Sequence, residues 1–275
     1  MINTFTFSDL QNKYKLSGKD KGVVSIPVGM SMDGEIETIQ PGVNSRHIAI
    51  TGHAGSGKST LLHSLICSIL QSYSAQEVQL ILHDSGMCEF RLFEELPFDN
   101  IRTVSTAEDP KHFLSLLNEL RQEIKHRENV LTAAGVDSYA QYAQKYSKSP
   151  FSHLIVVLDC SYQLLKWLGA PGDALQTILQ KGYALNIFFI IAGHDNAVLE
   201  YLPESIQHFF DTRILTHQGV DSAYRQLLGD REYAQKAQHL YCGEAIINKP
   251  ASHIIRIPYL DSEAERQIYR NLISL

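Results

Sequence analysis

Short apolar runs alternate with longer amphipathic stretches along most of the chain. The runs are too short for helices, and residues 154–158 contain no polar side chain, which is typical of a strand covered on both faces. The expected strands are residues 47–50, 79–83, 154–158, 187–192, 213–216, 245–247 and 253–257. Residues 58–70 and 110–134 instead repeat apolar positions every three or four residues, which predicts helices. This order predicts an α/β fold with a mainly parallel central sheet flanked by helices.

The N-terminal part of the chain has a different pattern. Residues 1–22 are mostly polar and indicate a short helix or a linker. Residues 23–30 and 35–39 alternate apolar and polar positions on either side of the turn pair Asp33-Gly34, which predicts a short hairpin-like β element. We therefore expect an N-terminal linker and β element at residues 1–40 and the main domain at residues 41–275.

Composition and charge narrow the classes of function. The chain has 275 residues, 44% of them hydrophobic, which suits one or two folded domains and excludes a disordered chain. Its formal net charge of −6 argues against a protein whose main task is to coat nucleic acid. The apolar runs are far shorter than the roughly 20 residues that span a bilayer, and no signal peptide is visible. The four cysteines are scattered, so a structural zinc site is not expected.

A glycine-rich segment carries the strongest chemical signal. Residues 52–59, Gly-His-Ala-Gly-Ser-Gly-Lys-Ser, satisfy the G-x-x-x-x-G-K-[ST] pattern between an apolar strand and an amphipathic helix. In such a loop, backbone N–H groups point at phosphate oxygens, the lysine reaches the β- and γ-phosphates, and the serine hydroxyl ligates Mg²⁺. The segment therefore predicts a nucleotide site. The expected phosphate-binding residues are Gly52, His53, Ala54, Gly55, Ser56, Gly57, Lys58, Ser59 and Thr60.

A phosphate loop of this kind predicts an acidic residue near the Mg²⁺ ion, at the end of a later strand. Asp159 follows the apolar run 154–158, so Ser59 and Asp159 are the expected metal ligands. The alternative for Asp159 is a helix N-cap or a solvated strand end. Asp84, after residues 81–83, is the other acidic candidate, because ligands gather at the carboxyl ends of parallel strands.

Several segments outside the loop occur in a characteristic order, at residues 26–29, 47–52, 81–86, 152–159, 212–214 and 220–222. Together with the loop they resemble the FtsK/SpoIIIE class of P-loop ATPases, and the resemblance covers roughly residues 23–258. Within that class the chain looks most like the tandem ATPase domains of type VII secretion motors (EssC or EccC). Those domains share the upstream Pro-x-Gly segment and the segments that lead into the second and fourth strands.

The resemblance implies a RecA-like P-loop NTPase fold that binds ATP and Mg²⁺. Type VII motors are membrane-anchored and carry several such domains, so the chain would be one domain on the cytoplasmic side of the cell membrane. Its end at Leu275 suits the C-terminal domain. The implied partners are the other ATPase domains of the motor and secreted protein substrates, which are small helical export partners. A homo-oligomer, hexameric in the full motor, is also implied, and direct nucleic-acid binding is not expected.

The chain departs from the family pattern at four positions. Family members with a working site usually carry Asp-Glu at the end of the fourth strand, and Cys160 occupies the place of that catalytic glutamate. The family's Thr-Gln sensor falls near His194, a usual arginine is Tyr183, and a usual basic residue is Ser85. A thiol cannot polarise the attacking water as a carboxylate does. The resemblance therefore implies a domain that binds ATP and hydrolyses it weakly or not at all.

Three functions compete at this point. The first is an ATP-binding domain of a type VII motor, with a regulatory or substrate-recognition role. The second is a DNA-translocating ATPase of the FtsK kind, and the third is a structural domain that has lost nucleotide binding. The negative net charge and the missing glutamate favour the first.

Overall fold

The computed structural model describes residues 4–17, 23–86, 89–96, 98–107, 109–161, 164, 172–194, 201–217, 228, 231–237, 239–249 and 251–273. The helices are α1 (Phe7–Ser17), α2 (Lys58–Ser72), α3 (Arg91–Glu94), α4 (Pro110–Ala133), α5 (Tyr139–Lys145), α7 (Gly172–Ala184), α9 (Glu204–Gln207), α11 (Arg231–Ala237) and α12 (Ser262–Ile273). The strands are β1 (Ile26–Ser31), β2 (Ile36–Ile39), β3 (Ile48–Gly52), β4 (Val78–Asp84), β5 (Ile101–Thr106), β6 (His153–Cys160), β7 (Ile187–His194), β8 (Thr212–Thr216), β9 (Glu244–Ile247) and β10 (His253–Arg256).

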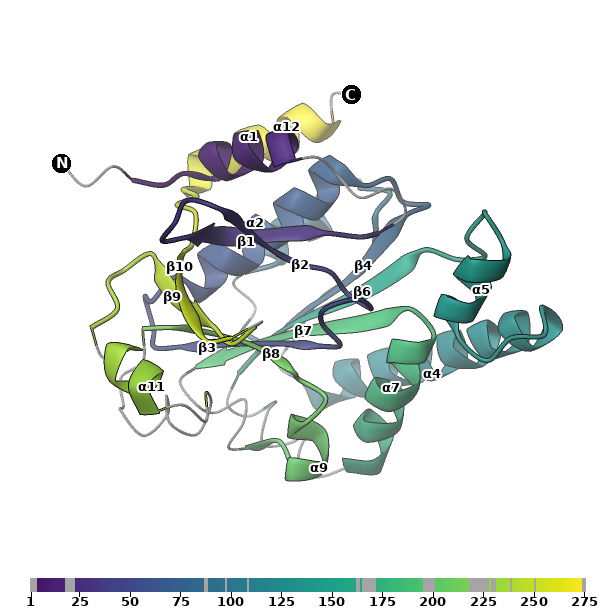
Figure 1. Ribbon diagram of the computed structural model, residues 1–275. Coiled ribbons are helices and arrows are strands. Elements are labelled where there is room, and N and C mark those ends of the chain that lie inside the picture. Colours follow the sequence, from purple (N-terminus) through teal and green to yellow (C-terminus); the bar gives the residue numbers. More distant parts are fainter. Residues whose placement is uncertain are drawn as a thin grey trace.

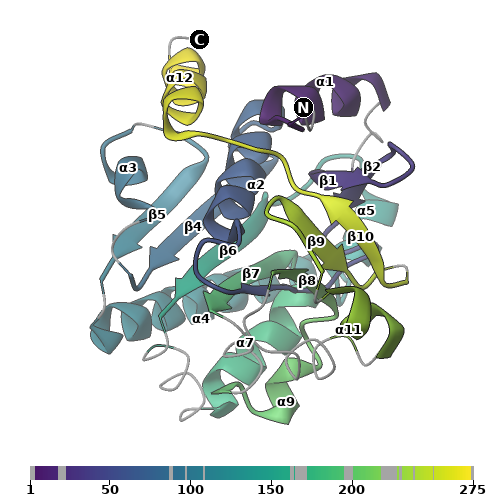
Figure 2. The ribbon, with the colours of Figure 1, turned by 90° about the vertical axis from the view of Figure 1, so that its left-hand side faces the viewer.

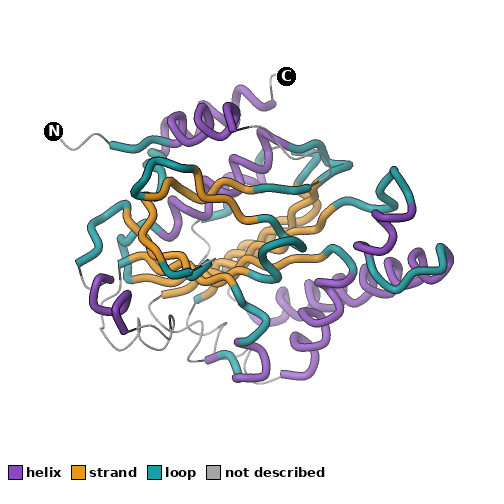
Figure 3. The backbone as a smooth tube through the Cα atoms, viewed as in Figure 1, coloured by secondary structure: helices purple, strands orange, loops and turns teal. Residues whose placement is uncertain are grey.

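One sheet forms the centre of the fold (Figures 1 and 3). Its strand order is β2-β1-β10-β9-β8-β3-β7-β6-β4-β5. The part from β8 to β5 is parallel, whereas β9, β10, β1 and β2 extend it as antiparallel neighbours. This arrangement confirms the predicted α/β class with a mainly parallel central sheet.

Helices cover both faces of this sheet. Helices α1, α2 and α12 lie on one face, and α4, α7 and α9 lie on the other (Figures 1 and 2). Because successive side chains of a strand point to opposite faces, each strand contributes to both layers of the core. In β6, for example, Ile155 and Val157 pack on the α2 side, and Val156 and Leu158 pack on the α4 side.

The predicted N-terminal β element belongs to the same sheet. Strands β1 and β2 form an antiparallel hairpin, and β1 also pairs with β10 near the other end of the chain. Gly29 makes this pairing possible, since a Cβ at that position would lie 2.4 Å from the Arg256 carbonyl oxygen. The expected helix or linker in residues 1–22 includes α1, whose residues Phe7 and Leu10 are buried in the core.

Within the described residues, no helix combines the length and apolar character needed to cross a membrane.

Candidate nucleotide-binding site

The glycine-rich loop lies at the carboxyl end of β3, between the ends of β7 and β8. Gly55 and Gly57 have φ angles of 76° and 99°, a backbone region that favours glycine. Gly57 is the last residue before α2, and the helix begins at Lys58. The loop therefore presents its backbone at a helix N-terminus, an arrangement that binds phosphate groups.

Strand β8 holds the start of this loop in place. The Ser56 hydroxyl is 2.6 Å from the Thr216 hydroxyl oxygen, and the His53 N–H donates to the His217 carbonyl at 2.7 Å. A Cβ on Gly52 would lie 1.8 Å from the Thr216 hydroxyl oxygen, so only glycine fits there. Gly52, His53 and Ser56 thus shape the loop from below.

Lys58 is buried, with 8% of its surface exposed. Its ammonium group donates to the His53 carbonyl at 3.0 Å and lies 3.5 Å from Nδ1 of His194. The first contact holds the lysine side chain across the loop, as expected for a group that reaches the outer phosphates. The second places His194, at the end of β7, beside the loop.

A cavity of about 750 Å³ opens over the loop. This volume is within the range of small-molecule sites in proteins. Of the nine residues predicted to bind the nucleotide, six line this cavity: Ala54, Gly55, Gly57, Lys58, Ser59 and Thr60. The remaining three form the underside of the loop, as described above.

Two carboxylates, Asp159 and Glu89, face the cavity beside Ser59. Burial, followed by the neighbouring Asp84 and Glu89 carboxylates, raises the pKa of Asp159 to about 7. The pKa of Glu89 is lowered, first by His63 and also by the Ser59 hydroxyl. Such a concentration of negative charge around a hydroxyl suits a hard divalent cation.

The residues present therefore fit Mg²⁺ bound together with a nucleotide. Ser59 and Asp159 would hold the ion, which supplies positive charge to the phosphate oxygens when bound. In the described part of the chain, no group of three or more His, Cys, Asp or Glu side chains could hold a metal ion by itself. The cation would thus take its other ligands from phosphate and water, as Mg²⁺ commonly does.

Asp84, the alternative acidic candidate, has a different environment. It is fully buried, and its carboxylate accepts backbone hydrogen bonds from Gly86 at 2.7 Å, Glu89 at 2.6 Å and Phe90 at 3.2 Å. These bonds hold the backbone at Gly86, Glu89 and Phe90. Asp84 thereby sets the position of Glu89, which our sequence reasoning did not identify as a site residue.

Cys160 lies on the opposite face of the sheet from Asp159. It is 3% exposed, it is absent from the cavity lining, and it packs with Leu158 and Leu164 in the core beneath α4 and α7. Burial, with the nearby Asp159 and Asp84 charges, raises the pKa of its thiol well above the usual range. The thiol is therefore neutral and turned away from the nucleotide site.

Of the other positions that depart from the family pattern, some lie at the nucleotide site and others lie in the surrounding fold. Ser85 is buried, and its hydroxyl donates to the Asp159 carbonyl at 3.1 Å, so it joins the end of β4 to the end of β6. Tyr183 is on α7, outside the cavity lining, with its ring 6.4 Å from that of Phe188. Only His194 of this group lines the cavity.

Part of the cavity lining is aromatic. Tyr241 and Tyr259 line it with 76% and 56% of their surfaces exposed, together with Met32 and the buried Phe5. The N-terminal segment builds this wall with the segment after β10, since the Tyr259 N–H donates to the Phe5 carbonyl at 2.7 Å. Flat, exposed side chains at this place could stack on a nucleobase.

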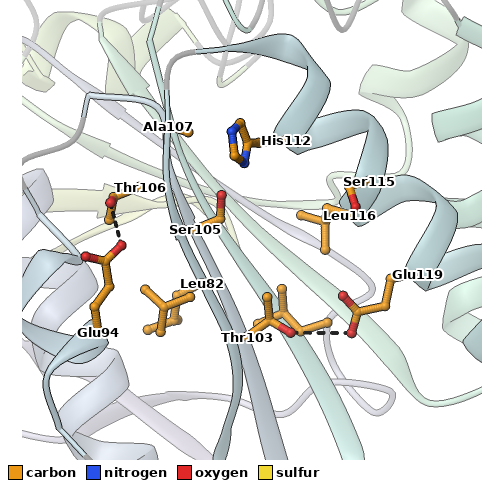
Figure 4. A pocket seen from close by; sticks show the side chains of 12 residues that line it. Leu82, Glu94, Thr103, Ser105, Thr106, Ala107, His112, Ser115, Leu116 and Glu119 are labelled. Atoms are coloured by element: carbon orange, nitrogen blue, oxygen red, sulfur yellow. Dashed lines mark hydrogen bonds between the residues drawn. The ribbon is translucent and has the colours of Figure 1, made fainter.

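A second cavity, of about 340 Å³, lies along the edge strand β5 (Figure 4). The Glu94 and Glu119 side chains border it, and they accept hydrogen bonds from Thr106 at 2.5 Å and Thr103 at 3.4 Å. Among the described residues, its lining includes neither lysine nor arginine and no residue of the glycine-rich loop. Carboxylates on two sides disfavour phosphate, so the nucleotide site is the larger cavity.

A comparison with models of known protein families shows which family the chain belongs to. The model described as "FtsK/SpoIIIE family" matches residues 10–236. The chain belongs to the FtsK/SpoIIIE family. Membership implies nucleotide binding with a divalent metal, in agreement with the cavity described above.

Relatives of this FtsK/SpoIIIE chain include motors of two kinds. The DNA translocase FtsK of Leptospira interrogans is 28% identical over 269 residues, which are 92% of this chain and 27% of that protein. The ESX-5 secretion system protein EccC5 of Mycobacterium tuberculosis is 28% identical over 168 residues, which are 58% of this chain and 12% of that protein. The chain thus spans about a quarter or less of the length of these relatives.

Solved structures support the fold of this family member. EssC (ATPases 2 and 3) from Geobacillus thermodenitrificans superposes with a TM-score of 0.76 at 20% identity, over 90% of this chain and 48% of that chain. Thermomonospora curvata EccC (ATPases 2 and 3), in complex with a signal sequence peptide, gives 0.72 at 20% identity, over 91% of this chain and 46% of that chain. The expected P-loop ATPase fold is confirmed.

Proposed function

We propose that this chain is an ATP- and Mg²⁺-binding ATPase domain of a type VII protein secretion motor, with a regulatory or substrate-recognition role. The observation that carries the proposal is the large cavity. Its lining combines the glycine-rich loop and Lys58 with Ser59, Asp159 and the exposed Tyr241 and Tyr259. One cavity thus offers groups suited to the phosphates, the cation and the nucleobase of a bound nucleoside triphosphate.

We further propose that the domain hydrolyses ATP slowly. The strand that supplies Asp159 ends in Cys160, whose neutral thiol is in the core, so β6 offers no second carboxylate, in addition to Asp159, to the attacking water. General-base assistance is typically worth about 10²–10⁴-fold in rate. Binding without rapid turnover suits a domain that regulates its neighbours or recognises substrate.

The proposed partners are the other ATPase domains of the motor and small helical secreted proteins. Support comes from the similar EccC structure, which contains a signal sequence peptide. The proposed location is the cytoplasmic side of the cell membrane, as one domain of a membrane-anchored motor, and the proposed assembly in the full motor is a hexamer.

A DNA-translocating ATPase of the FtsK kind is the second candidate. The favourable observation is that similarity to FtsK extends over 92% of this chain, against 58% for EccC5. The net charge of −6 opposes it, because binding to duplex DNA depends on phosphate contacts from lysine and arginine.

Two measurements on the purified chain test these proposals. Titration of a fluorescent ATP analogue should give Mg²⁺-dependent binding that Lys58→Ala abolishes, with turnover well below the rate of about 1 per second that is usual for enzymes. Absence of binding would support the third candidate, a structural domain without nucleotide. Fluorescence anisotropy with duplex DNA at physiological salt should show no submicromolar binding, and tight binding with a steep salt dependence would favour the translocase.

A further inference from the structure

His63 is on α2, one turn beyond the glycine-rich loop, and lies between two carboxylates. Its Nε2 atom is 3.4 Å from Glu89, which faces the nucleotide cavity. Its Nδ1 atom forms a hydrogen bond with Glu265 of α12. The Tyr269 hydroxyl donates to the same Glu265 carboxylate at 2.8 Å. This row of side chains connects α12 to the cavity.

Both ring nitrogens of His63 thus face acceptors, so the ring acts as a double donor, and a double donor is the protonated form. Burial opposes that charge, yet the hydrogen bonds that the ring donates to Glu265 and Glu89 prevail and raise the pKa of His63 to about 9. The His63 side chain is only 9% exposed. The imidazolium is therefore a fixed positive charge that holds Glu89 on one side and α12 on the other.

Glu89 links this row to the glycine-rich loop. The Asp84 carboxylate accepts from the Glu89 N–H at 2.6 Å and fixes its backbone, while His63 fixes its side chain. In that position the Glu89 carboxylate lines the cavity with Ser59, and the Ser59 hydroxyl is, after His63, one of the groups that lower the pKa of Glu89. A hydroxyl has one hydrogen and two lone pairs. When its hydrogen points to Glu89, its lone pairs are left for another partner, which here means the cavity.

We propose that Glu89 is a positioning residue for the Mg²⁺-bound nucleotide, and that α12 holds it through Glu265 and His63. Glu89 orients the Ser59 oxygen toward the cation by accepting the proton of that hydroxyl. The C-terminal helix is thereby part of the nucleotide site, although it contributes no residue to the cavity lining. The inference rests on the proposed nucleotide–Mg²⁺ site and adds the chain of side chains that arranges it.

The experiment compares nucleotide affinity in excess Mg²⁺ with affinity in a chelator, and takes the ratio as the Mg²⁺ effect. Outer-shell partners of metal ligands typically contribute about 10–100-fold to metal affinity. Glu89→Gln, which keeps the shape and removes the charge, should reduce the Mg²⁺ effect by about tenfold or more and leave the chelator affinity nearly unchanged. Glu265→Gln should reduce it several-fold. The exposed carboxylates of Glu95 and Glu263 provide matched controls, and Glu95→Gln and Glu263→Gln should leave it unchanged.

A double-mutant cycle distinguishes an effect of Glu89 that acts through Ser59 from a direct attraction between the Glu89 charge and the cation. If Glu89 acts through Ser59, Glu89→Gln should have little further effect on the Mg²⁺ ratio in a Ser59→Ala background. The inference would be overturned if the effects of Glu89→Gln and Ser59→Ala on the Mg²⁺ ratio added, or if Glu89→Gln kept the wild-type Mg²⁺ ratio. If Glu89→Gln does not fold, Glu265→Gln outside the cavity carries the same test, and a full Mg²⁺ effect there would overturn the link to α12.

These outcomes differ from failure of the proposed function. That failure would appear as absence of nucleotide binding in the wild-type chain, with or without Mg²⁺. Binding that Lys58→Ala abolishes, combined with an intact Mg²⁺ effect in Glu89→Gln, would overturn the inference alone.

Discussion

Asp159 and Cys160 are consecutive in β6, yet their side chains lie on opposite faces of the sheet. Asp159 faces the cavity over the glycine-rich loop, and Cys160 is in the core on the α4 side. The strand has regular parallel pairing through both residues, with Asp84 and Ala192 opposite Asp159 and Gly193 opposite Cys160. A carboxylate introduced at position 160 would therefore enter the core rather than the site.

The first prediction concerns this position. Cys160→Glu should lower the free energy of unfolding by at least about 3 kcal/mol, because it buries an ionisable group without a partner. It should not accelerate ATP hydrolysis. Denaturant unfolding and a steady-state ATPase assay test both statements. Cys160→Ala is the control and should cost only about 1 kcal/mol. Full stability together with a tenfold rise in turnover for Cys160→Glu would show that the residue can reach the nucleotide.

The second prediction concerns Lys58. Ligand binding to the folded state alone stabilises it by RT ln(1 + [L]/Kd), roughly 2.7 kcal/mol at a hundredfold excess over Kd. ATP with Mg²⁺ should therefore raise the melting temperature of the wild-type chain, and Lys58→Ala should lose this shift. Lys125→Ala, an exposed lysine on α4, should retain it. An equal shift in Lys58→Ala and wild type would contradict phosphate binding at the loop.

The third prediction separates a contribution of Tyr259 to nucleobase binding from one to phosphate binding. Stacking of an aromatic side chain on a nucleobase is worth about 1–3 kcal/mol. Tyr259→Ala should weaken ATP binding about fivefold or more and leave the binding of inorganic tripolyphosphate unchanged, as measured by calorimetry. Tyr183→Ala, at an exposed tyrosine outside the cavity, should change neither. Equal losses for both ligands would mean that Tyr259 acts on phosphate binding rather than on the nucleobase.

The fourth prediction tests the contact between the loop and β8. In Gly52→Ala the new Cβ would lie 1.8 Å from the Thr216 hydroxyl oxygen and 2.6 Å from that of Ser56. Overpacking of this kind typically costs about 1–3 kcal/mol, and the displaced loop should also bind nucleotide less tightly. Thr216→Ala removes the nearest atom, so the double variant should recover part of the stability. Wild-type stability in Gly52→Ala would mean that the loop has more freedom than the structure indicates.

Much of the fold could be predicted from local pattern. The strand and helix around the glycine-rich loop, the apolar run of β6 and the long helix α4 all have strong periodicity. Strand β5 was not predicted, because Ile101–Thr106 is a partly exposed edge strand without a continuous apolar run. The order of the strands was not predictable either, since it depends on pairings between distant segments such as β1 and β10.

The site was predictable only in part, for a similar reason. The glycine-rich loop and Asp159 belong to local patterns, but the position of Glu89 near the loop depends on its backbone bond to Asp84 and on the distant His63. The signal in the sequence that could have identified Glu89 was its position just after a parallel strand. For Cys160 the signal was the two-residue period of a strand, which turns residue 160 away from whatever residue 159 faces.

The last prediction concerns the pH dependence of stability through His63. In the folded chain its pKa is about 9, against an ordinary value of 6.5, with Glu89 and Glu265 facing the ring and Cys67 and Tyr269 close to Glu265. Because the folded state binds this proton more tightly, the stabilisation is complete below about pH 6.5 and is lost as the pH rises through about 9. The difference between the two pKa values corresponds to roughly 3 kcal/mol.

Denaturant unfolding at several pH values between 6 and about 9.5 measures this contribution in wild type and in His63→Gln. The stability difference between them should be largest at the acidic end and shrink by roughly 3 kcal/mol toward the basic end. Groups that do not interact with His63 cancel in the difference, whereas Asp159, whose pKa the His63 charge lowers, contributes a smaller part of it. His126→Gln, at an exposed position on α4, should follow the wild-type curve throughout. A pH-independent difference between wild type and His63→Gln would mean that the ring is neutral in the folded chain, and that Glu89 is held by packing rather than by charge.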